Sequence, residues 1–184
     1  LAPRISLRYR LNSRQSIKFS YNKNHQYISL LSHTAISTPE DTWKLSDPHL
    51  RPISANQYAV GYYRNFKNNS IETSVEVYYK QLSNLIEYKN DAEIEMNPHV
   101  ETELINAKGN NYGIEFSVKK KEGKLQGSLN YTYSRTFRKT NGNFEQSVIN
   151  DNEYYPSAYD KPHDLTINAN YSINRRWRVS ANFM

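Results

Sequence analysis

Few residues of this sequence have the type and spacing that catalysis or metal binding requires. Cysteine is absent, which excludes disulfides, cysteine-ligated zinc and thiol catalysis. The five histidines show neither the i, i+4 spacing of a helical metal site nor a second histidine two residues along a strand. They are His25, His33, His49, His99 and His163. Because no Ser-His-Asp order, P-loop or dinucleotide fingerprint is present either, we predict a protein that is not an enzyme and holds no cofactor.

Two smaller features suggest chemistry, and in both a structural role is favoured. His163 follows Pro162 where a strand is expected to begin, so a role at the strand entry is preferred over catalysis. An acidic segment contains Glu93, Glu95, His99, Glu101 and Glu103. Its oxygens could bind a divalent cation, but EF-hand spacing is missing and such runs of charge are usually solvated. We therefore predict a solvated loop and no metal site.

Aromatic residues in long polar segments are the best candidates for ligand binding. Trp43 lies in one such segment, and Tyr154, Tyr155 and Tyr159 lie in another, with Asn and Asp residues nearby. Their rings could stack on a sugar or on an aromatic chelate. The equally weighted alternative is that they pack the loops against the structure below.

Alternation of apolar and polar residues indicates the strands that must position these loops. Between Ile71 and Lys80 the odd positions are mostly apolar and the even positions mostly polar or charged, which is typical of a half-buried strand. Eight segments follow this rule, over residues 5–11, 17–22, 56–66, 71–80, 112–119, 125–134, 165–171 and 177–183. The sequence therefore predicts an all-β, antiparallel up-and-down meander of about eight strands.

The connections between these segments alternate in length. Tight turns rich in Asn and Gly join segments one and two, three and four, five and six, and seven and eight. The other three connections are long, roughly residues 28–55, 89–107 and 138–160, and loops of such length are usually functional. All the short turns must then lie at one end of the sheet and all the long loops at the other. Most Lys and Arg side chains outside the strands accompany the turns, whereas the 89–107 loop is acidic.

A one-sided apolar sheet can either pack on other protein layers or face lipid. Only 37% of the 184 residues are hydrophobic, there are 16 Tyr, and no apolar run approaches the ~20 residues of a membrane helix. Three features favour a membrane barrel: the regular asymmetry of turns and loops, the many aromatic residues on the apolar face, and the charges on the opposite face. A small soluble core could not bury those charges unpaired, whereas a watery or plugged lumen could.

Several segments in order resemble one family of proteins. They are Gln57 to Tyr62 (QYAVGY), Glu76 to Lys80 (EVYYK), Ala107 to Lys120 (AKGNNYGIEFSVKK), Leu129 to Ser134 (LNYTYS) and Asp160 to Asp164 (DKPHD). This ordered set resembles the C-terminal β-barrel of TonB-dependent outer-membrane receptors, especially those of Bacteroidota. The resemblance covers nearly the whole chain.

The resemblance implies a fold and a function. Family members are similar in having a 22-stranded barrel, an N-terminal plug and a TonB box, and eight strands cannot enclose so wide a lumen. We expect residues 1–184 to form a single segment of a larger transmembrane barrel, without plug, TonB box or signal peptide in this chain. The implied function is active uptake of a scarce nutrient, such as a metal chelate, a vitamin or a glycan, across the Gram-negative outer membrane.

The same resemblance implies the partners. They are outer-membrane lipid, TonB acting through the plug, a small-molecule or glycan ligand and, as in glycan importers, a surface lipoprotein. A nucleic-acid partner is disfavoured, although the net charge is +6, because the cations are split between turn tips and the inner face and no binding motif accompanies them.

Two alternatives stay open on the sequence. One is a complete eight-stranded outer-membrane barrel that acts as an adhesin or anchor, which requires the first strand to pair with the last. The other is a soluble β-domain that binds carbohydrate through its loops, which requires a covered apolar face.

Overall fold

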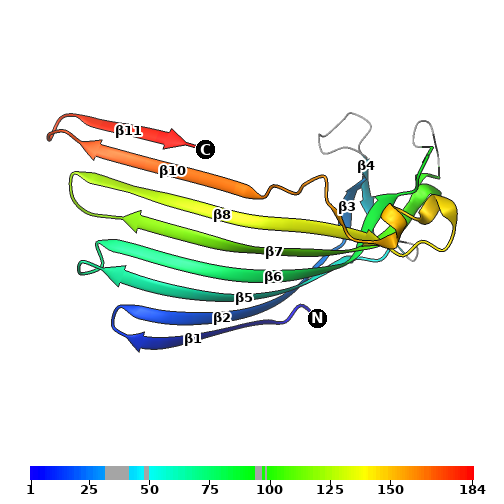
Figure 1. Cartoon of the computed structure of the whole chain (residues 1–184), viewed down its shortest axis with the longest axis horizontal. Helices are drawn as coiled ribbons and strands as arrows, with labels where there is room; N and C mark the ends of the chain where they lie inside the picture. The colour runs from blue at the N-terminus through cyan, green and yellow to red at the C-terminus, as the bar shows by residue number, and fades with distance from the viewer. Residues whose placement is uncertain (32–41, 48–49, 94–96, 98) are drawn as a thin grey trace.

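One antiparallel sheet dominates the computed structural model, which describes residues 1–31, 42–47, 50–93, 97 and 99–184 (Figure 1). Its strands follow the order β1-β2-β5-β6-β7-β8-β10-β11, and β9 pairs with β8 at the end of the sheet. We call this the main sheet. Its strands are β1 (Arg4–Asn12), β2 (Gln15–Gln26), β5 (Ile53–Phe66), β6 (Ile71–Tyr88), β7 (Leu104–Lys120), β8 (Leu125–Thr140), β9 (Tyr155–Pro156), β10 (His163–Ser172) and β11 (Arg178–Phe183).

The expected meander of eight antiparallel strands is confirmed, but the long connections contain more structure than expected. β3 (Ile28–Leu31) and β4 (Thr42–Leu45) form a separate two-stranded sheet within the first connection. Three short 3-10 helices occupy parts of the other two: η1 (Val100–Glu103), η2 (Glu145–Ser147) and η3 (Asn150–Asn152). β6 continues to Tyr88, well beyond the alternating pattern, because backbone pairing with β7 does not depend on which side chains the strands carry.

The four tight turns lie together at one end of the main sheet, and the long connections lie at the other (Figure 1). We call these ends the turn end and the loop end. At the β5–β6 turn, Lys67, Asn68 and Asn69 have φ values of 46°, 53° and 71°, and Gly123 in the β7–β8 turn has a φ of 95°. Asn and Gly adopt this left-handed region more readily than other residues, which explains why they mark the turns.

The strand register places the apolar residues of all eight strands on one face, which we call the apolar face. One row crosses seven strands through directly paired residues: Tyr9, Ile17, Tyr62, Val75, Phe116, Tyr131 and Leu165. Since side chains alternate along a strand, the residues between them form an opposite, polar face. The alternation in the sequence therefore predicted both faces correctly.

Among the described residues, none forms a second layer over most of the main sheet. The solvent-accessible surface is 13015 Å², against roughly 9,200 Å² expected for a globular protein of this mass. The few buried apolar residues of the described chain, Leu31, Leu50, Ala55, Ala59, Leu85 and Ala107, lie mostly toward the loop end. None of the described helices is long and apolar enough to span a membrane.

Candidate functional site

The apolar face is exposed along the whole middle of the main sheet. Leu7 is 62% exposed, Val60 49% and Val77 53%, although all three lie well inside their strands. Contiguous apolar surface of this extent is rare on soluble monomers and marks a surface that is covered by lipid or protein. The apolar face is therefore a binding surface in its own right.

Aromatic residues border the apolar face at both ends. Tyr21, Tyr58, Tyr79 and Tyr112 are directly paired across four neighbouring strands. The hydroxyl of Tyr21 donates to Asn56 Oδ1 at 3.0 Å, so it points toward the loop end.

The Tyr79 hydroxyl points the same way, because it donates to Asn110 Oδ1 at 3.1 Å. At the turn end the border is formed by Phe66, which pairs with Ile71, and by Tyr171, which pairs with Leu125. Tyr62 pairs with Val75 and lies in the middle of the apolar face.

The band between these borders has the dimensions of a bilayer core. On β6 it runs from Ile71 to Tyr79, which is about nine residues and, for a strand tilted by ~40°, a height of about 20 Å. Tyrosine suits such a border because its ring is apolar and its hydroxyl prefers water.

The polar face carries charges that no second layer of described residues covers. Glu76 pairs directly with Glu115, and Arg8 pairs directly with Lys18. Tyr63 donates to Glu76 Oε2 at 2.7 Å. Like charges placed directly opposite destabilise a sheet unless water or counter-charges screen them, so this face suits a lumen.

Glycines give the polar face room for large rings. A Cβ placed on Gly113 would lie 2.8 Å from Tyr78 Oη, and one on Gly61 would lie 2.8 Å from the ring of Tyr63. Tyr78 thus covers a glycine of the neighbouring strand β7, and Tyr63 covers a glycine of its own strand β5. A larger residue at either glycine position would have to displace the ring.

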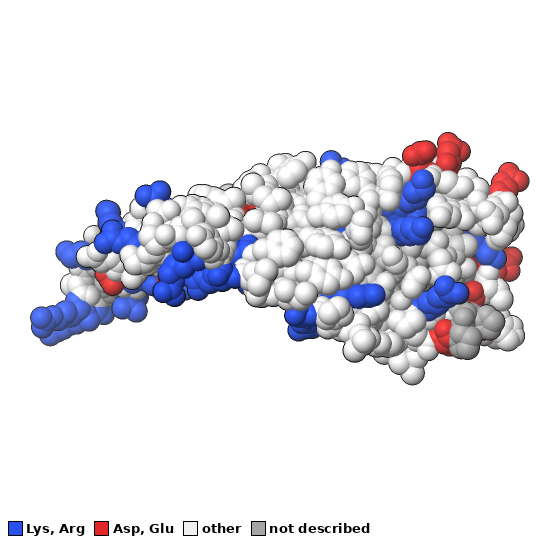
Figure 2. Space-filling model, turned by 90° about the horizontal axis from the view of Figure 1, so that it is seen from below, with Lys and Arg blue, Asp and Glu red and all other residues white. Residues whose placement is uncertain are grey.

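Charge is separated along the long axis of the molecule. Figure 2 shows Lys and Arg gathered at the turn end and most Asp and Glu at the loop end. This agrees with the distribution inferred from the sequence. The two ends of the sheet therefore present different electrostatic surfaces.

Three of the four candidate ligand-binding aromatics gather at the end of β8. Tyr155 pairs with Arg138, whose Cζ lies 5.8 Å from the ring centroid of Tyr159. Lys139 Nζ lies 5.6 Å from the ring centroid of Tyr154. Tyr154 is 46% and Tyr159 58% exposed.

Trp43 belongs to a different part of the loop end. It lies in β4, is 63% exposed and pairs with Leu30 of β3. The four aromatics are therefore split between two elements.

Tyr155 differs from its neighbours in being partly buried. Burial, with a further contribution from the nearby Glu87 carboxylate, raises the pKa of Tyr155 to about 12. Its hydroxyl finds no hydrogen-bond partner among the described residues. Glu87 itself forms an ion pair with Arg138. Tyr155 thus packs the loop on the end of β8, whereas Tyr154 and Tyr159 keep exposed rings.

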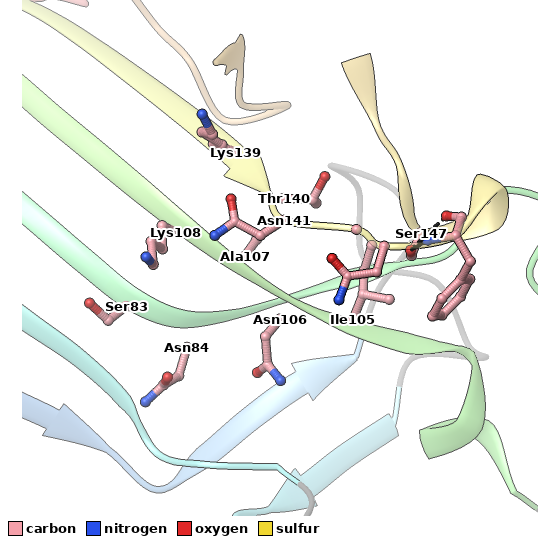
Figure 3. Close-up of a pocket in the computed structure, with 13 residues that line it drawn as sticks. Ser83, Asn84, Ile105, Asn106, Ala107, Lys108, Lys139, Thr140, Asn141 and Ser147 are labelled. Carbon is pink, nitrogen blue, oxygen red and sulfur yellow. Dashed lines mark hydrogen bonds between the residues drawn. The ribbon is translucent and has the colours of Figure 1, made fainter. Parts of the chain in front are cut away.

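A cleft beside these tyrosines was not predicted from the sequence. It has a volume of about 310 Å³ and is lined by residues from β6, β7, the end of β8 and the segment that follows β8. Figure 3 shows Asn84, Asn106, Lys108 and Lys139 around it. Lys108 and Lys139 are direct register partners, so two cations stand side by side.

The cleft depends on a bulge in β6. The register shifts between Leu82 and Leu85, and Asn84 there has a φ of 58°. Its side-chain amide donates to the backbone oxygen of Pro52 at 3.0 Å. An Asn inside a long strand is only a weak sequence signal for a bulge. The strand register is needed to show which residues the bulge brings together.

The acidic segment is held by ion pairing at one of its residues. Lys44 Nζ lies 2.9 Å from Glu101 Oε2 and lowers the pKa of that carboxyl group, and His99 Nδ1 lies 3.8 Å from its other oxygen. The described residues contain no cluster of His, Asp and Glu that could hold a metal ion. Glu95, His33 and His49 lie outside the described residues.

The DKPHD segment fastens the third connection to β8. Asp160 accepts from the Arg135 Nε at 2.8 Å and from the Thr136 backbone N–H at 2.6 Å. His163 begins β10, and its Nδ1 lies 2.9 Å from the Tyr131 hydroxyl. Asp160 and His163 are therefore each bonded to residues of β8.

Comparison with known proteins identifies the family to which the main sheet belongs. The family described as TonB dependent receptor-like, beta-barrel matches residues 1–184. A chain in the solved structure of the FpvAI-pyocin S2 complex superposes with a TM-score of 0.55 and 13% sequence identity. The match covers 98% of the present chain and 28% of the other, so it shows a shared fold over about a quarter of a longer chain. No curated protein sequence matches.

Proposed function

Because this chain belongs to the TonB-dependent receptor-like β-barrel family, we propose that it forms part of the wall of an outer-membrane receptor for active nutrient uptake. Its own contribution is to span the membrane and to carry the connections at the loop end. The energy would come from TonB, acting through a plug domain inside the barrel. The proposed role is transport rather than catalysis.

The observation that carries this proposal is the apolar face with aromatic residues at both of its ends. Tyr21 and Tyr79 direct their hydroxyls to the loop end, and Phe66 and Tyr171 lie on the same face at the turn end. An outward-facing apolar band between aromatic girdles, opposite a polar lumen face, is what an outer-membrane barrel requires. The short turns then face the periplasm and the long connections face the cell exterior.

Both alternative functions fit less well. A complete eight-stranded barrel would require β1 to pair with β11, yet these strands lie at opposite edges of an open sheet and no described pairing joins them. A soluble domain would require a covered apolar face, and that face is exposed. We propose that further strands of the same receptor pair with β1 and β11 and close the barrel.

The proposed ligand is a scarce nutrient such as a metal chelate, a vitamin or a glycan. Trp43, Tyr154 and Tyr159 offer exposed rings at the loop end, and Tyr155, between the latter two in the sequence, pairs with Arg138 of β8. A surface lipoprotein that caps the barrel is an additional proposed partner for a glycan ligand.

The first experiment locates the receptor and tests its dependence on TonB. Cells that carry the tagged, full-length receptor are fractionated, and uptake of candidate chelates, vitamins and glycans is compared with and without TonB. The proposal requires the receptor in the outer membrane and uptake of at least one nutrient that is lost without TonB. A receptor recovered in the soluble fraction would overturn it.

The second experiment tests the ligand-binding aromatics with a matched control. Trp43 and Trp177 are 63% and 68% exposed but lie at the loop end and the turn end, respectively. Trp43→Ala should weaken affinity for the transported nutrient by about threefold to tenfold, which is the usual contribution of a stacked ring. Trp177→Ala should leave that affinity unchanged. Equal affinities for both variants and the parent receptor would exclude Trp43 from the ligand site.

A further inference from the structure

The cleft beside Asn84 opens on the same face of the main sheet as the apolar residues. On β7 the even positions, such as Phe116 and Tyr112, lie on the apolar face, and Lys108 continues this alternation without a register shift between β7 and β8. Lys139 is the direct partner of Lys108 and therefore lies on the same face. Because both lysines line the cleft, it lies on the side of the barrel wall that the proposed function turns outward.

This face carries no carboxylate in any of the described strands of the main sheet. All the Asp and Glu side chains of those strands lie on the polar face: Glu72, Glu76, Glu87, Glu115 and Asp164. The residues that line the cleft likewise include no Asp or Glu, and Lys108 and Lys139 are its charged members. A cleft that presents only positive charge favours an anion.

The two lysines differ from the next cation along β8 on this face. The Nε of Arg135 lies 2.8 Å from Asp160 Oδ2, so that cation already has a carboxylate. Neither Lys108 nor Lys139 forms an ion pair with a described residue, and Lys139 lies over the ring of Tyr154. In the described sheet they are also the one pair of like charges directly opposite each other on the apolar face. Their shared charge is therefore left for an external anion.

The row of tyrosines at the loop end fixes the height of the cleft in a membrane. The hydroxyl of Tyr79 in this row donates to Asn110 Oδ1, and Lys108 lies two residues beyond Asn110 on the same face of β7. For a strand tilted by ~40°, two residues span a height of about 5 Å. Each headgroup layer of a bilayer is about 5–8 Å thick, so Lys108 and Lys139 lie within that layer.

Apolar surface joins the lipid-facing band to the cleft. Phe137 lies on the same face of β8 as Lys139, and its ring stacks with Tyr112 at 6.2 Å between ring centroids. Phe144 in the cleft lining is 57% exposed. Cations beside apolar surface fit an anionic lipid better than a small free anion. A transported nutrient would instead pass along the polar face, on the other side of the sheet.

We propose that this cleft binds a phosphate group of a glycolipid in the outer leaflet of the outer membrane. The inference rests on the proposed function, because that function places the loop end at this leaflet. Lys108 and Lys139 would contact the phosphate oxygens through charge-assisted hydrogen bonds. The side-chain amides of Asn106 and Asn141, which Figure 3 shows around the same cleft, would contact sugar hydroxyl groups, and Phe137 would contact the first acyl carbons.

The test measures lipid preference in the full-length receptor. The receptor is purified in a neutral detergent, and native mass spectrometry compares binding of phosphorylated lipid A with binding of the same glycolipid after its phosphates are removed. Each cation near an anionic lipid contributes about fivefold to affinity, so Lys108→Gln combined with Lys139→Gln should weaken binding of the phosphorylated form by about 30-fold. Binding of the dephosphorylated form should change little, and Lys108→Arg combined with Lys139→Arg should keep the parent affinity.

A second double variant controls for total charge. Arg64→Gln combined with Lys120→Gln removes the same number of cations from the same face of the sheet, but at the turn end and outside the cleft lining. It should reduce binding of the phosphorylated glycolipid by less than about threefold. If the two Gln double variants lose affinity equally, or if the parent receptor binds both forms of the glycolipid equally well, the proposed cleft site is wrong.

Two further measurements separate the other outcomes. Inorganic phosphate at 100-fold excess over the lipid should not displace the phosphorylated glycolipid, and full displacement would show a free-phosphate site instead. Heat-dependent migration of the parent and each variant in gels reports the folded barrel. A parent receptor without such migration would overturn the membrane function itself, whereas a folded barrel without lipid preference would overturn only the cleft site.

Discussion

The middle of the main sheet and the loop end are built from the same strands but are held in different ways. In the middle, neighbours such as Val75 and Phe116 meet through regular pairing, and each strand repeats the pattern of the last. At the loop end, single contacts such as Asp160 with Arg135 decide the geometry. The comparison shows that the middle is held by many equivalent strand pairs, whereas the loop end depends on a few individual bonds.

The largest expected effect tests which face of the sheet meets lipid. Val75 and Ser74 are adjacent on β6 and point to opposite faces. Val75→Arg should lower the free energy of unfolding in vesicles by about 2–4 kcal/mol, the cost of arginine near the bilayer midplane. Ser74→Arg, on the polar face, should cost well under half as much. Denaturant unfolding followed by tryptophan fluorescence checks this, and equal losses would contradict a lipid-facing apolar face.

The same difference between regions decides what could be predicted from the sequence. The meander, both faces and the positions of the turns follow from period-2 alternation and from Asn and Gly, because these depend on residues close together in the chain. The 3-10 helices and β3–β4 were missed because they have no comparable period.

The candidate site was predicted only in part. Tyr154, Tyr155 and Tyr159 were identified as aromatics in a long connection, and the structure brings them together at the end of β8. The cleft beside them requires the bulge at Asn84 and the pairing of Lys108 with Lys139. Both depend on residues over 20 positions apart, so no local pattern could reveal them.

The second expected effect concerns how the third connection is fastened. The Asp160 side chain is 8% exposed and accepts the Thr136 N–H at 2.6 Å. Asp160→Ala should cost about 1.5–3 kcal/mol, because a hydrogen bond to a charged group is lost at a largely buried site. Cleavage of residues 141–162 by protease should then become faster in the folded receptor.

Lys161→Ala is the matched control in the same segment. Lys161 pairs with Asp164, and these side chains are 69% and 41% exposed. An exposed ion pair contributes less than about 1 kcal/mol, so protease sensitivity should barely change. If both variants are cleaved equally fast, Asp160 does not fasten the connection.

The third expected effect is a loss of about 1 kcal/mol in the free energy of unfolding at alkaline pH. The folded pKa of Tyr155 is raised to about 12 from an ordinary value near 10, so the unfolded chain loses this proton first as the pH rises. Tyr155 therefore contributes stability that is complete below pH 10 and is lost between pH 10 and 12. Tyr155→Phe should reduce the alkaline loss of stability at the loop end and leave stability at pH 7 nearly unchanged. Tyr154→Phe, at an exposed ring, should not alter the alkaline profile.

The smallest effect tests the two cations beside the cleft. Lys108 and Lys139 are directly opposite on β7 and β8, a placement that destabilises a pair of like charges. Lys108→Glu would convert them into an opposite-charge pair and should stabilise the receptor by about 0.2–1 kcal/mol, and less at high salt. In the middle of the sheet, where each pair is one of many, such a change would be hard to detect. At the loop end it should also slow hydrogen exchange of the surrounding amides, because it replaces repulsion between the two paired strands by attraction. Faster exchange in Lys108→Glu would contradict the expected relief of repulsion between the two lysines.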